Sequence, residues 1–379
     1  MPVRATTTVD IREEIALMAL SGAYTISELA ELFEITRPTI YKYRERYRVG
    51  GRSGLVDQRR APKHPRRTPD AMVRRIVAER RRWGWGSKKI RRRLLDAEPE
   101  RAWPARSTID EIFKRHQLVV PRRRPLRIRS PFRQSYTATE PGELTSIDFK
   151  GEFRLGNRRW CHPLTIVDST SRYLLACHAL DSIALNGVWP VFERVLREHG
   201  LPAAVLSDNG PPFGGHGLTR WSTFSVRLMK LDIQPVLIDP GHPEQNAAHE
   251  RMHRSLKDGA TLRPGRDLSH QQRIFNLFRR TYNHERPHEG IGLARPARCY
   301  SGSPRPFPSR PPLIEYPSSF EVRTVSSCGT IKWRHHPLFI SHSFSGERLG
   351  FELCDDRTWT VHFASFVIGK FNEHERRFL

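Results

Sequence analysis

The chain has 379 residues, enough for two or three domains that each bury a core of their own. Its formal net charge of +24, from 64 Lys/Arg against 40 Asp/Glu, predicts a polyanionic partner, either nucleic acid or an anionic membrane. No apolar run approaches the ~18 residues that span a bilayer, and the N-terminal residues lack the apolar segment of a secretory signal, so nucleic acid is favoured.

The five cysteines show neither disulfide spacing nor the C-x2-C pairs of a structural zinc site. They are scattered and odd in number, which predicts a protein of a reducing compartment. They are Cys161, Cys177, Cys299, Cys328 and Cys354.

Residues 1–55 are predicted to form a helix-turn-helix DNA-binding domain. After a first helix in DIREEIALMAL, the stretch TISELAELF begins with Thr25 as an N-cap and Glu28 three residues later, the capping-box pattern. In RPTIYKYRERYR, Pro38 stands near the start of a cationic third helix, where its missing N–H costs nothing. The last helix of such a motif lies in the major groove; a three-helix bundle with a solvated basic face is the alternative. The expected DNA contacts are Arg37, Thr39, Lys42 and Arg44.

Residues 65–120 are predicted to form a second, basic helix-turn-helix-like domain. Its helices are TPDAMVRRIVAERRR, GSKKIRRRLL and RSTIDEIFKRHQL, the last capped by Ser107 or Thr108. Residues 59–133 hold 25 Lys/Arg against 7 Asp/Glu, with tryptophans interleaved, which favours a folded basic surface over a solvated charge run. Such a surface makes DNA binding steeply salt-dependent.

Three stretches rich in Pro, Gly or Arg are predicted to be linkers. They are residues 51–67, the basic segment 121–140, which we expect to run along DNA, and residues 302–317.

Strands and helices alternate in residues 141–300, which predicts a mixed α/β catalytic core. LTSIDFKGEFRL, HPLTIVD and SRYLLACHAL predict antiparallel strands, and ALNGVWPVFERVLREHG an amphipathic helix closed by Gly200. AAVLSD and IQPVLI predict buried strands separated by the helix TRWSTFSVRLMKLD, and further helices follow. Short alternating strands in residues 318–379 predict a small C-terminal β-barrel. The expected fold class is therefore multidomain α+β.

Three acids of this core point to phosphoryl transfer. Asp148 lies in the first strand, Asp208 ends the strand AAVLSD, and Glu250 lies on the helix after DPGHPEQN, with 59 and 41 residues intervening. The edge of a sheet and a neighbouring helix can bring them together. Two divalent ions about 3.5–4 Å apart then bind the attacking and leaving oxygens, and Mg²⁺ prefers carboxylate, water and phosphate ligands. We therefore expect these acids to be catalytic and to bind two Mg²⁺ or Mn²⁺ ions.

The helix around Glu250 carries unusually many cations. Glu250, Arg254 and Lys257 stand at i, i+4 and i+7 and share one face. We expect the carboxylate to hold metal while the two cations contact the DNA backbone; an exposed Glu–Arg pair worth ~0.3–0.5 kcal/mol is the alternative. The residues expected to face the core are Ala248, Met252 and Leu256.

Three segments resemble the catalytic blocks of DDE insertion-sequence transposases with a retroviral-integrase-like core: SIDFKGEF, LSDNGPPF and GHPEQNAAHERMHRSLK. The stretch YNHERPHEGIG is also similar to a segment found after that core, and the resemblance covers most of the chain. It implies a ribonuclease H-like core in which Asp148, Asp208 and Glu250 match the metal-binding acids. The family commonly has fewer than the 41 residues found here between the second acid and the glutamate.

The resemblance also implies a reaction and its partners. Metal-activated water would cleave the ends of a mobile element, and the freed 3′-OH would attack target DNA. The partners would be double-stranded DNA, as element ends and target, and further copies of the chain, at least a dimer on DNA. The location implied is the bacterial cytoplasm, at the nucleoid. The competing interpretations are a non-catalytic helix-turn-helix regulator and a structure-specific nuclease on the same core.

Other polar residues are assigned mostly structural roles. Asp168 is expected to cap a turn or pair with Arg172 rather than serve as a fourth acid, and Asn209 either orients a metal-bound water or holds a turn. No zinc-like spacing joins the histidines, so they are expected to be bases or phosphate contacts rather than metal ligands. The segment 286–288 is expected to hold a helix end or touch DNA. No GxxxxGK loop is present, so ATP use is not indicated. The histidines concerned are His242, His249 and His253.

Overall fold

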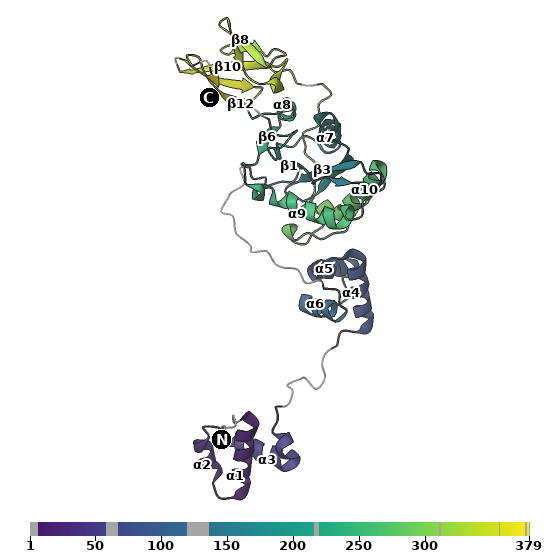
Figure 1. Ribbon diagram of the computed structural model, residues 1–379, viewed down its shortest axis with the longest axis vertical. Helices are drawn as coiled ribbons and strands as arrows, with labels where there is room; N and C mark the ends of the chain where they lie inside the picture. Colours follow the sequence, from purple (N-terminus) through teal and green to yellow (C-terminus); the bar gives the residue numbers. More distant parts are fainter. Residues whose placement is uncertain are drawn as a thin grey trace. The chain divides into compact units, whose positions relative to one another are not determined.

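The computed structural model describes residues 7–57, 67–119, 136–215, 220–310, 312–355, 357–375 and 377–378. Internal contacts divide the chain into two units, Met1–Pro69 and Asp70–Leu379 (Figure 1). Most of the two linkers predicted at 51–67 and 121–140 lies outside the described residues. Within the described part, no helix is both long enough and apolar enough to cross a bilayer.

The first unit contains three helices, as predicted. They are α1 (Thr8–Ser21), α2 (Ile26–Leu32) and α3 (Arg37–Gly54), and they bury Ile15, Leu29 and Ile40 between them. The capping box at the start of α2 is confirmed: the backbone N–H of Thr25 donates to Glu28 Oε2 at 2.7 Å, and the N–H of Glu28 donates to Thr25 Oγ1 at 3.3 Å. Helical structure continues into the stretch predicted as a linker, with an interruption at Gly51, whose φ is 54°.

The second unit begins with three more helices, α4 (Asp70–Trp83), α5 (Ser87–Ala97) and α6 (Arg106–Arg115). Their apolar faces meet around Ile76, Ile90 and Ile109, all fully buried, and the rings of Trp83 and Trp85 stack at 4.7 Å. The predicted cap of α6 is wrong, because Ala105 occupies the N-cap and makes no side-chain bond there.

A six-stranded mixed sheet forms the centre of the second unit. Its strands are β1 (Leu144–Phe149), β2 (Phe153–Arg154), β3 (Trp160–Asp168), β4 (Leu174–Leu180), β5 (Ala204–Ser207) and β6 (Gln234–Leu237). Strand β1 pairs antiparallel with β3 and parallel with β5, while β4 extends the sheet beyond β3 and β6 extends it beyond β5. The predicted sequence of antiparallel strands leading into parallel ones is therefore confirmed.

Helices cover both faces of this sheet (Figure 1). On one face, α7 (Leu185–His199) and α8 (Thr223–Met229) pack Phe192 and Phe224 against Ile147 and Ile166. On the other, α9 (Ala247–Leu256) and α10 (Leu268–His284) pack Met252, Leu256 and Phe275 against β3 and β4, after which α11 (Pro296–Cys299) follows. The carboxyl end of β1 lies beside α9, where Ser146 Oγ is 2.7 Å from His249 Nδ1.

The C-terminal residues form open sheets, so the predicted β-barrel is wrong. The strands are β7 (Glu321–Thr324), β8 (Thr330–Trp333), β9 (His336–Phe339), β10 (Arg348–Asp355), β11 (Thr358–Phe363), β12 (Phe366–Asn372) and β13 (Arg377–Phe378). One sheet has the order β13-β12-β11-β10-β7, β8 and β9 pair separately, and among the described strands no ladder joins β13 to β7. The apolar side chains, including Trp333 and Phe351, pack instead with Val226 and Met229 of α8. Helix α8 therefore covers this core, although the strands do not close into a barrel.

Candidate active site

Asp148 lies near the carboxyl end of β1, where the strand leaves the buried centre of the sheet. Ile147 before it is fully buried in the core, whereas the Asp148 side chain is 20% exposed. Because side chains alternate along a strand, Asp148 and Ser146 point to the same face, the one covered by α9. The acid is thus held by a rigid strand at the edge of that face.

Asp208 follows β5, the parallel neighbour of β1. The last pair of the β1–β5 register is Ser146 with Leu206, and Asp148 and Asp208 each stand two residues beyond it. The backbone N–H of Gly210 donates to Asp208 Oδ1 at 3.2 Å. The amide of Asn209 donates to Ile238 O at 2.7 Å, which ties the loop after β5 to the end of β6. This contact supports the structural interpretation of Asn209.

Glu250 lies in the first turn of α9 and is exposed. The loop before α9 is closed by Gln245, whose amide donates to Asp239 Oδ2 at 2.6 Å and accepts the N–H of Asp239 at 2.8 Å. Arg254 and Lys257 are exposed as well, with Lys257 in a π-helical turn that continues α9. The predicted polar face of this helix is therefore accessible to a ligand.

The buried face of α9 differs from the prediction. Met252 and Leu256 face the core as expected, but Ala248 is only half-buried. His249 is 0% exposed and His253 is 8% exposed. Two histidines therefore lie under the helix, between it and the sheet.

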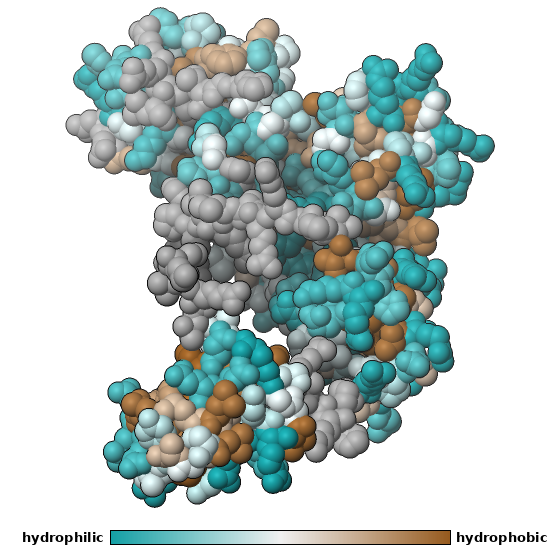
Figure 2. Space-filling model, turned by 60° about the horizontal axis from the view of Figure 1, so that its bottom comes forward, coloured by the Kyte–Doolittle hydropathy of each residue, from teal (hydrophilic) through white to brown (hydrophobic). Residues whose placement is uncertain are grey.

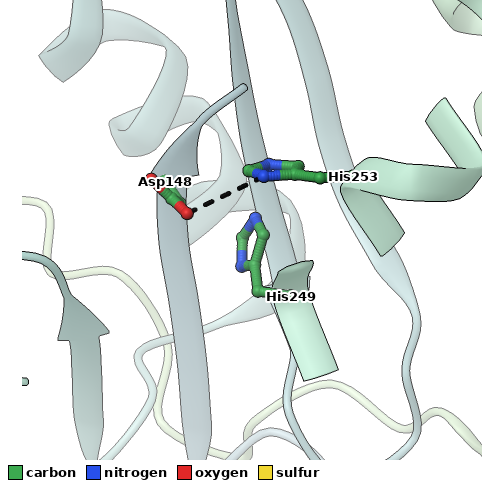
Figure 3. Close-up of side chains that lie close together, drawn as sticks. All are labelled: Asp148, His249 and His253. Atoms are coloured by element: carbon green, nitrogen blue, oxygen red, sulfur yellow. Dashed lines mark ion pairs between the residues drawn. The ribbon is translucent and has the colours of Figure 1, made fainter. Parts of the chain in front are cut away.

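These histidines meet Asp148 (Figure 3). Ligand atoms of Asp148, His249 and His253 lie within 4.8 Å of one another, a set that can hold a metal ion. His253 Nδ1 is 3.8 Å from Asp148 Oδ2, and the two imidazoles meet edge to face with centroids 4.7 Å apart. Asp208 and Glu250 are outside this close group. The i, i+4 spacing of His249 and His253 on one helix is a sequence signal for this group, although it does not match the spacing of a zinc site.

The three acids nevertheless share an electrostatic environment. Burial, together with the negative charges of Asp208 and Glu250, raises the pKa of Asp148 to about 7, against the opposing effects of a hydrogen bond from the backbone of Phe149 and the charge of Lys150. Burial also raises the pKa of Asp208. For His253, burial lowers the pKa to about 3. The carboxylates fit a hard divalent ion, because a cation among them would offset both the burial and the mutual repulsion that raise the pKa of Asp148.

Asp168 is a structural acid. It is 0% exposed, and its carboxylate accepts the N–H of Gly142 at 2.8 Å and the N–H of Ser171 at 2.7 Å. It caps the turn after β3, as predicted.

Replacing this acid tests that assignment. Asp168→Ala is expected to lower the free energy of unfolding by about 3 kcal/mol, because it leaves two buried N–H groups unpaired. Urea denaturation would measure this, with Mn²⁺ affinity unchanged in the folded variant. A variant of normal stability that had lost Mn²⁺ binding would instead identify Asp168 as a fourth metal-binding acid.

Segment 286–288, which was predicted to hold a helix end or touch DNA, makes contacts within the fold. The N–H of Arg286 donates to Thr281 O at 3.1 Å at the end of α10. His288 Nε2 lies 3.2 Å from the carbonyl of Tyr282 and its ring packs against that tyrosine at 4.4 Å. This favours the helix-end role of segment 286–288 over chemistry.

Comparison with known families identifies the domains. Two models described as integrase core domains match residues 138–243 and 231–296. A helix-turn-helix domain model matches residues 11–63, and a homeodomain-like domain model matches residues 39–113. The sheet carrying Asp148 and Asp208 and the helix carrying Glu250 therefore lie within the integrase core matches.

Among curated proteins, the chain is similar to products of bacterial insertion elements. It is 27% identical over 62% of its length to the insertion element IS407 uncharacterized 31.7 kDa protein of Burkholderia multivorans, of which it covers 82%. It is 28% identical over 59% of its length to the insertion element IS476 uncharacterized 39.2 kDa protein of Xanthomonas euvesicatoria, of which it covers 62%.

Among solved structures, the chain is similar to retroviral integrases at low TM-scores. The HTLV-2 integrase catalytic core domain in complex with magnesium matches with a TM-score of 0.34 and 13% identity, covering 43% of this chain and 99% of that one. A simian T-cell lymphotropic virus intasome matches with a TM-score of 0.38 and 14% identity, covering 68% of this chain and 84% of that one.

Proposed function

We propose that the chain is an insertion-sequence transposase with an integrase core, which cleaves the ends of a mobile DNA element and joins them to target DNA. The observation that carries this proposal is the environment of Asp148. Asp208 directly follows the adjacent parallel strand β5, and the charges of Asp208 and Glu250 both act on the carboxyl group of Asp148. Such convergence of acids at one sheet edge suits metal-dependent phosphoryl transfer.

Each acid has a distinct part in the proposed site. The charges of Asp208 and Glu250 both act on the carboxyl group of Asp148, so we propose that Asp148 would contribute to both of two metal positions, Asp208 to one and Glu250 to the other. Bound Mg²⁺ or Mn²⁺ would activate the attacking oxygen and stabilise the charge that develops on the phosphate. No covalent bond between protein and DNA is needed in this mechanism.

The cations around the acids serve to hold DNA. Arg254 and Lys257 are exposed on the helix that carries Glu250, and Lys150 stands two residues after Asp148. Their charges can pair with backbone phosphates on either side of the reacting one, which fixes the register of the strand. The face shown in Figure 2 is mostly hydrophilic, with apolar residues in separate small patches, as suits a surface that meets a polyanion. Because two element ends must be joined, we propose at least a dimer on DNA.

A joining assay tests the proposed function. The protein is incubated with Mg²⁺, labelled element-end DNA and a supercoiled plasmid. The proposal expects labelled end DNA to become covalently joined to the plasmid. End binding without cutting would indicate a regulator, and cutting without joining would indicate a nuclease; either result would contradict the proposal.

Helix α3 is proposed to supply the end-binding contacts. Arg37 and Lys42 are exposed on it, Thr39 is half-buried with its hydroxyl 2.9 Å from that of Thr36, and the Arg44 guanidinium lies 5.1 Å from the centre of the Tyr41 ring. The first two are thus free to reach phosphates or base edges, whereas the other two are partly engaged within the domain.

Arg37→Ala is expected to weaken end binding and to reduce the salt slope of log K by about 1, because one phosphate contact is lost. Fluorescence anisotropy at several salt concentrations measures both. The matched control is Arg48→Ala, which removes an exposed arginine of the same helix that already pairs with Glu45 at 3.2 Å. Equal losses in the two variants would show a general charge effect and contradict groove docking through the start of α3.

A further inference from the structure

Thr165 connects both histidines to the strand that carries Asp148. Its Oγ1 donates to the carbonyl of Asp148 at 3.0 Å, since β1 and β3 pair these two residues. The same oxygen lies 2.7 Å from His249 Nε2 and 2.8 Å from His253 Nε2. One hydroxyl group therefore makes three hydrogen bonds.

A single assignment of hydrogens satisfies all three bonds. A hydroxyl has one proton and two acceptor lone pairs. Because the proton of Thr165 goes to a carbonyl, which can only accept, both histidines must donate from Nε2. In a neutral imidazole with Nε2 protonated, Nδ1 carries a lone pair. The Nδ1 atoms of His249 and His253 are therefore acceptors.

The two lone pairs have different surroundings. His249 Nδ1 lies 2.7 Å from Ser146 Oγ, which can donate to it, so both nitrogens of His249 are used. His253 Nδ1 instead faces Asp148 Oδ2 at 3.8 Å. When Asp148 is ionised, a lone pair opposite its carboxylate is repulsive unless a cation lies between them.

The separation fits a metal ion better than a direct contact. An N–H···O⁻ bond would close to about 2.7–2.9 Å, well below the observed 3.8 Å. Metal–nitrogen and metal–carboxylate bonds of about 2.0–2.2 Å each allow an N-to-O separation of this size across one ion. His253 also stands three residues after Glu250, so the two are neighbours on α9, with Glu250 exposed and His253 buried.

We infer that His253 is a nitrogen ligand, through Nδ1, of the divalent ion held by Asp148. This assignment rests on the proposed function and adds a residue to its metal site. Thr165 is then a positioning residue that fixes the imidazole with Nδ1 directed at the ion, as the outer partners of metal-bound histidines do. His249 takes part only by holding Thr165 and Ser146. An imidazole in the site favours Mn²⁺ or a later transition metal more than an all-oxygen site does.

Pulsed electron paramagnetic resonance of bound Mn²⁺ tests the assignment directly. The full-length protein is prepared with natural and with ¹⁵N-labelled histidine and loaded with one equivalent of Mn²⁺. The expected spectrum shows nitrogen coupling to the ion that changes from the ¹⁴N to the ¹⁵N pattern on labelling. No coupling from histidine in protein that has bound Mn²⁺ would overturn the assignment. This comparison needs no substitution, so it does not depend on a variant folding.

Two matched variants identify which histidine supplies the nitrogen that couples to Mn²⁺. His253→Gln is expected to lose the coupling and about 10-fold in Mn²⁺ affinity by calorimetry, while Mg²⁺ affinity falls less. His249→Gln, four residues away on the same face of α9, is expected to keep the coupling. Coupling that persists in His253→Gln, or that disappears only in His249→Gln, would overturn the assignment.

Asp148→Asn separates this inference from the proposed function. If Mn²⁺ binding depends on Asp148 but shows no histidine coupling, only the role of His253 is overturned. If Asp148→Asn binds Mn²⁺ as tightly as the unchanged protein and its spectrum is the same, the proposed metal site itself is overturned as well.

Discussion

Asp148→Asn is expected to lower the rates of end cleavage and joining at least ~10³-fold, because a bound metal supplies several kcal/mol of transition-state stabilisation and this acid is assigned to both metal positions. Binding of element ends should change little, since the helix-turn-helix contacts are in a separate unit of the chain. The measurement is the joining assay with labelled end DNA, together with anisotropy for end binding.

The matched control is Asp181→Asn, which removes an exposed acid just after β4 that pairs with Arg159 at 3.5 Å. It should retain cleavage and joining. If Asp148→Asn joined DNA at the rate of this control, the assignment of Asp148 would be wrong.

Without divalent metal, Asp148→Asn is expected to be more stable than the unchanged protein at pH 8. The pKa of Asp148 rises from 3.8 to about 7 on folding, so its protonated form stabilises the fold. That contribution is fully present below pH 3.8 and is lost as the pH rises through about 7. A pKa difference of this size corresponds to a loss of at most about 4 kcal/mol of folding stability when Asp148 ionises. The variant avoids this loss because its Asn side chain does not ionise.

Thermal unfolding of both proteins in EDTA from pH 4 to pH 8 measures this difference. The two unfolding temperatures should agree near pH 4 and diverge as the pH rises, with the variant higher. Adding Mg²⁺ at pH 8 should raise the unfolding temperature of the unchanged protein and leave that of the variant nearly constant. A constant difference between the proteins at all pH values would contradict the raised pKa.

Local rules predicted the helices and the central strands well. The capping box at Thr25 depends on two residues three apart, and the structure contains both of its bonds. Gly200 ends α7 with a φ of 83°, as the pattern of an amphipathic helix followed by glycine predicts. Such features are decided by neighbours in the sequence, so one chain without relatives is enough to find them.

The errors arose where distant packing decides the outcome. Alternating strands in the tail predicted a barrel, but barrel closure depends on the first and last strands meeting. The apolar face formed by Trp333 and Phe351 packs on Val226 and Met229 of α8 instead. No local pattern reveals that a helix more than a hundred residues before Trp333 supplies this cover.

In the candidate site, too, features set by local sequence were predicted and features set by distant packing were missed. The acids were identified by their places at strand ends and on a helix, and Asp148 and Asp208 each stand two residues beyond the last pair of the β1–β5 register. The buried histidines were missed as a group with Asp148, because their partner Thr165 is 84 residues from His249 in the sequence. Their i, i+4 spacing indicates a shared helix face but not which face is buried.

The central claim is that the acids hold divalent ions in one pocket, and anomalous diffraction from Mn²⁺-soaked crystals of the protein bound to element-end DNA tests it most directly. We predict two anomalous peaks about 3.5–4 Å apart, with carboxylate oxygens of Asp148 bound to both, Asp208 to one and Glu250 to the other. Crystals with no anomalous peak near Asp148, whether or not they show Mn²⁺ elsewhere, would contradict the claim.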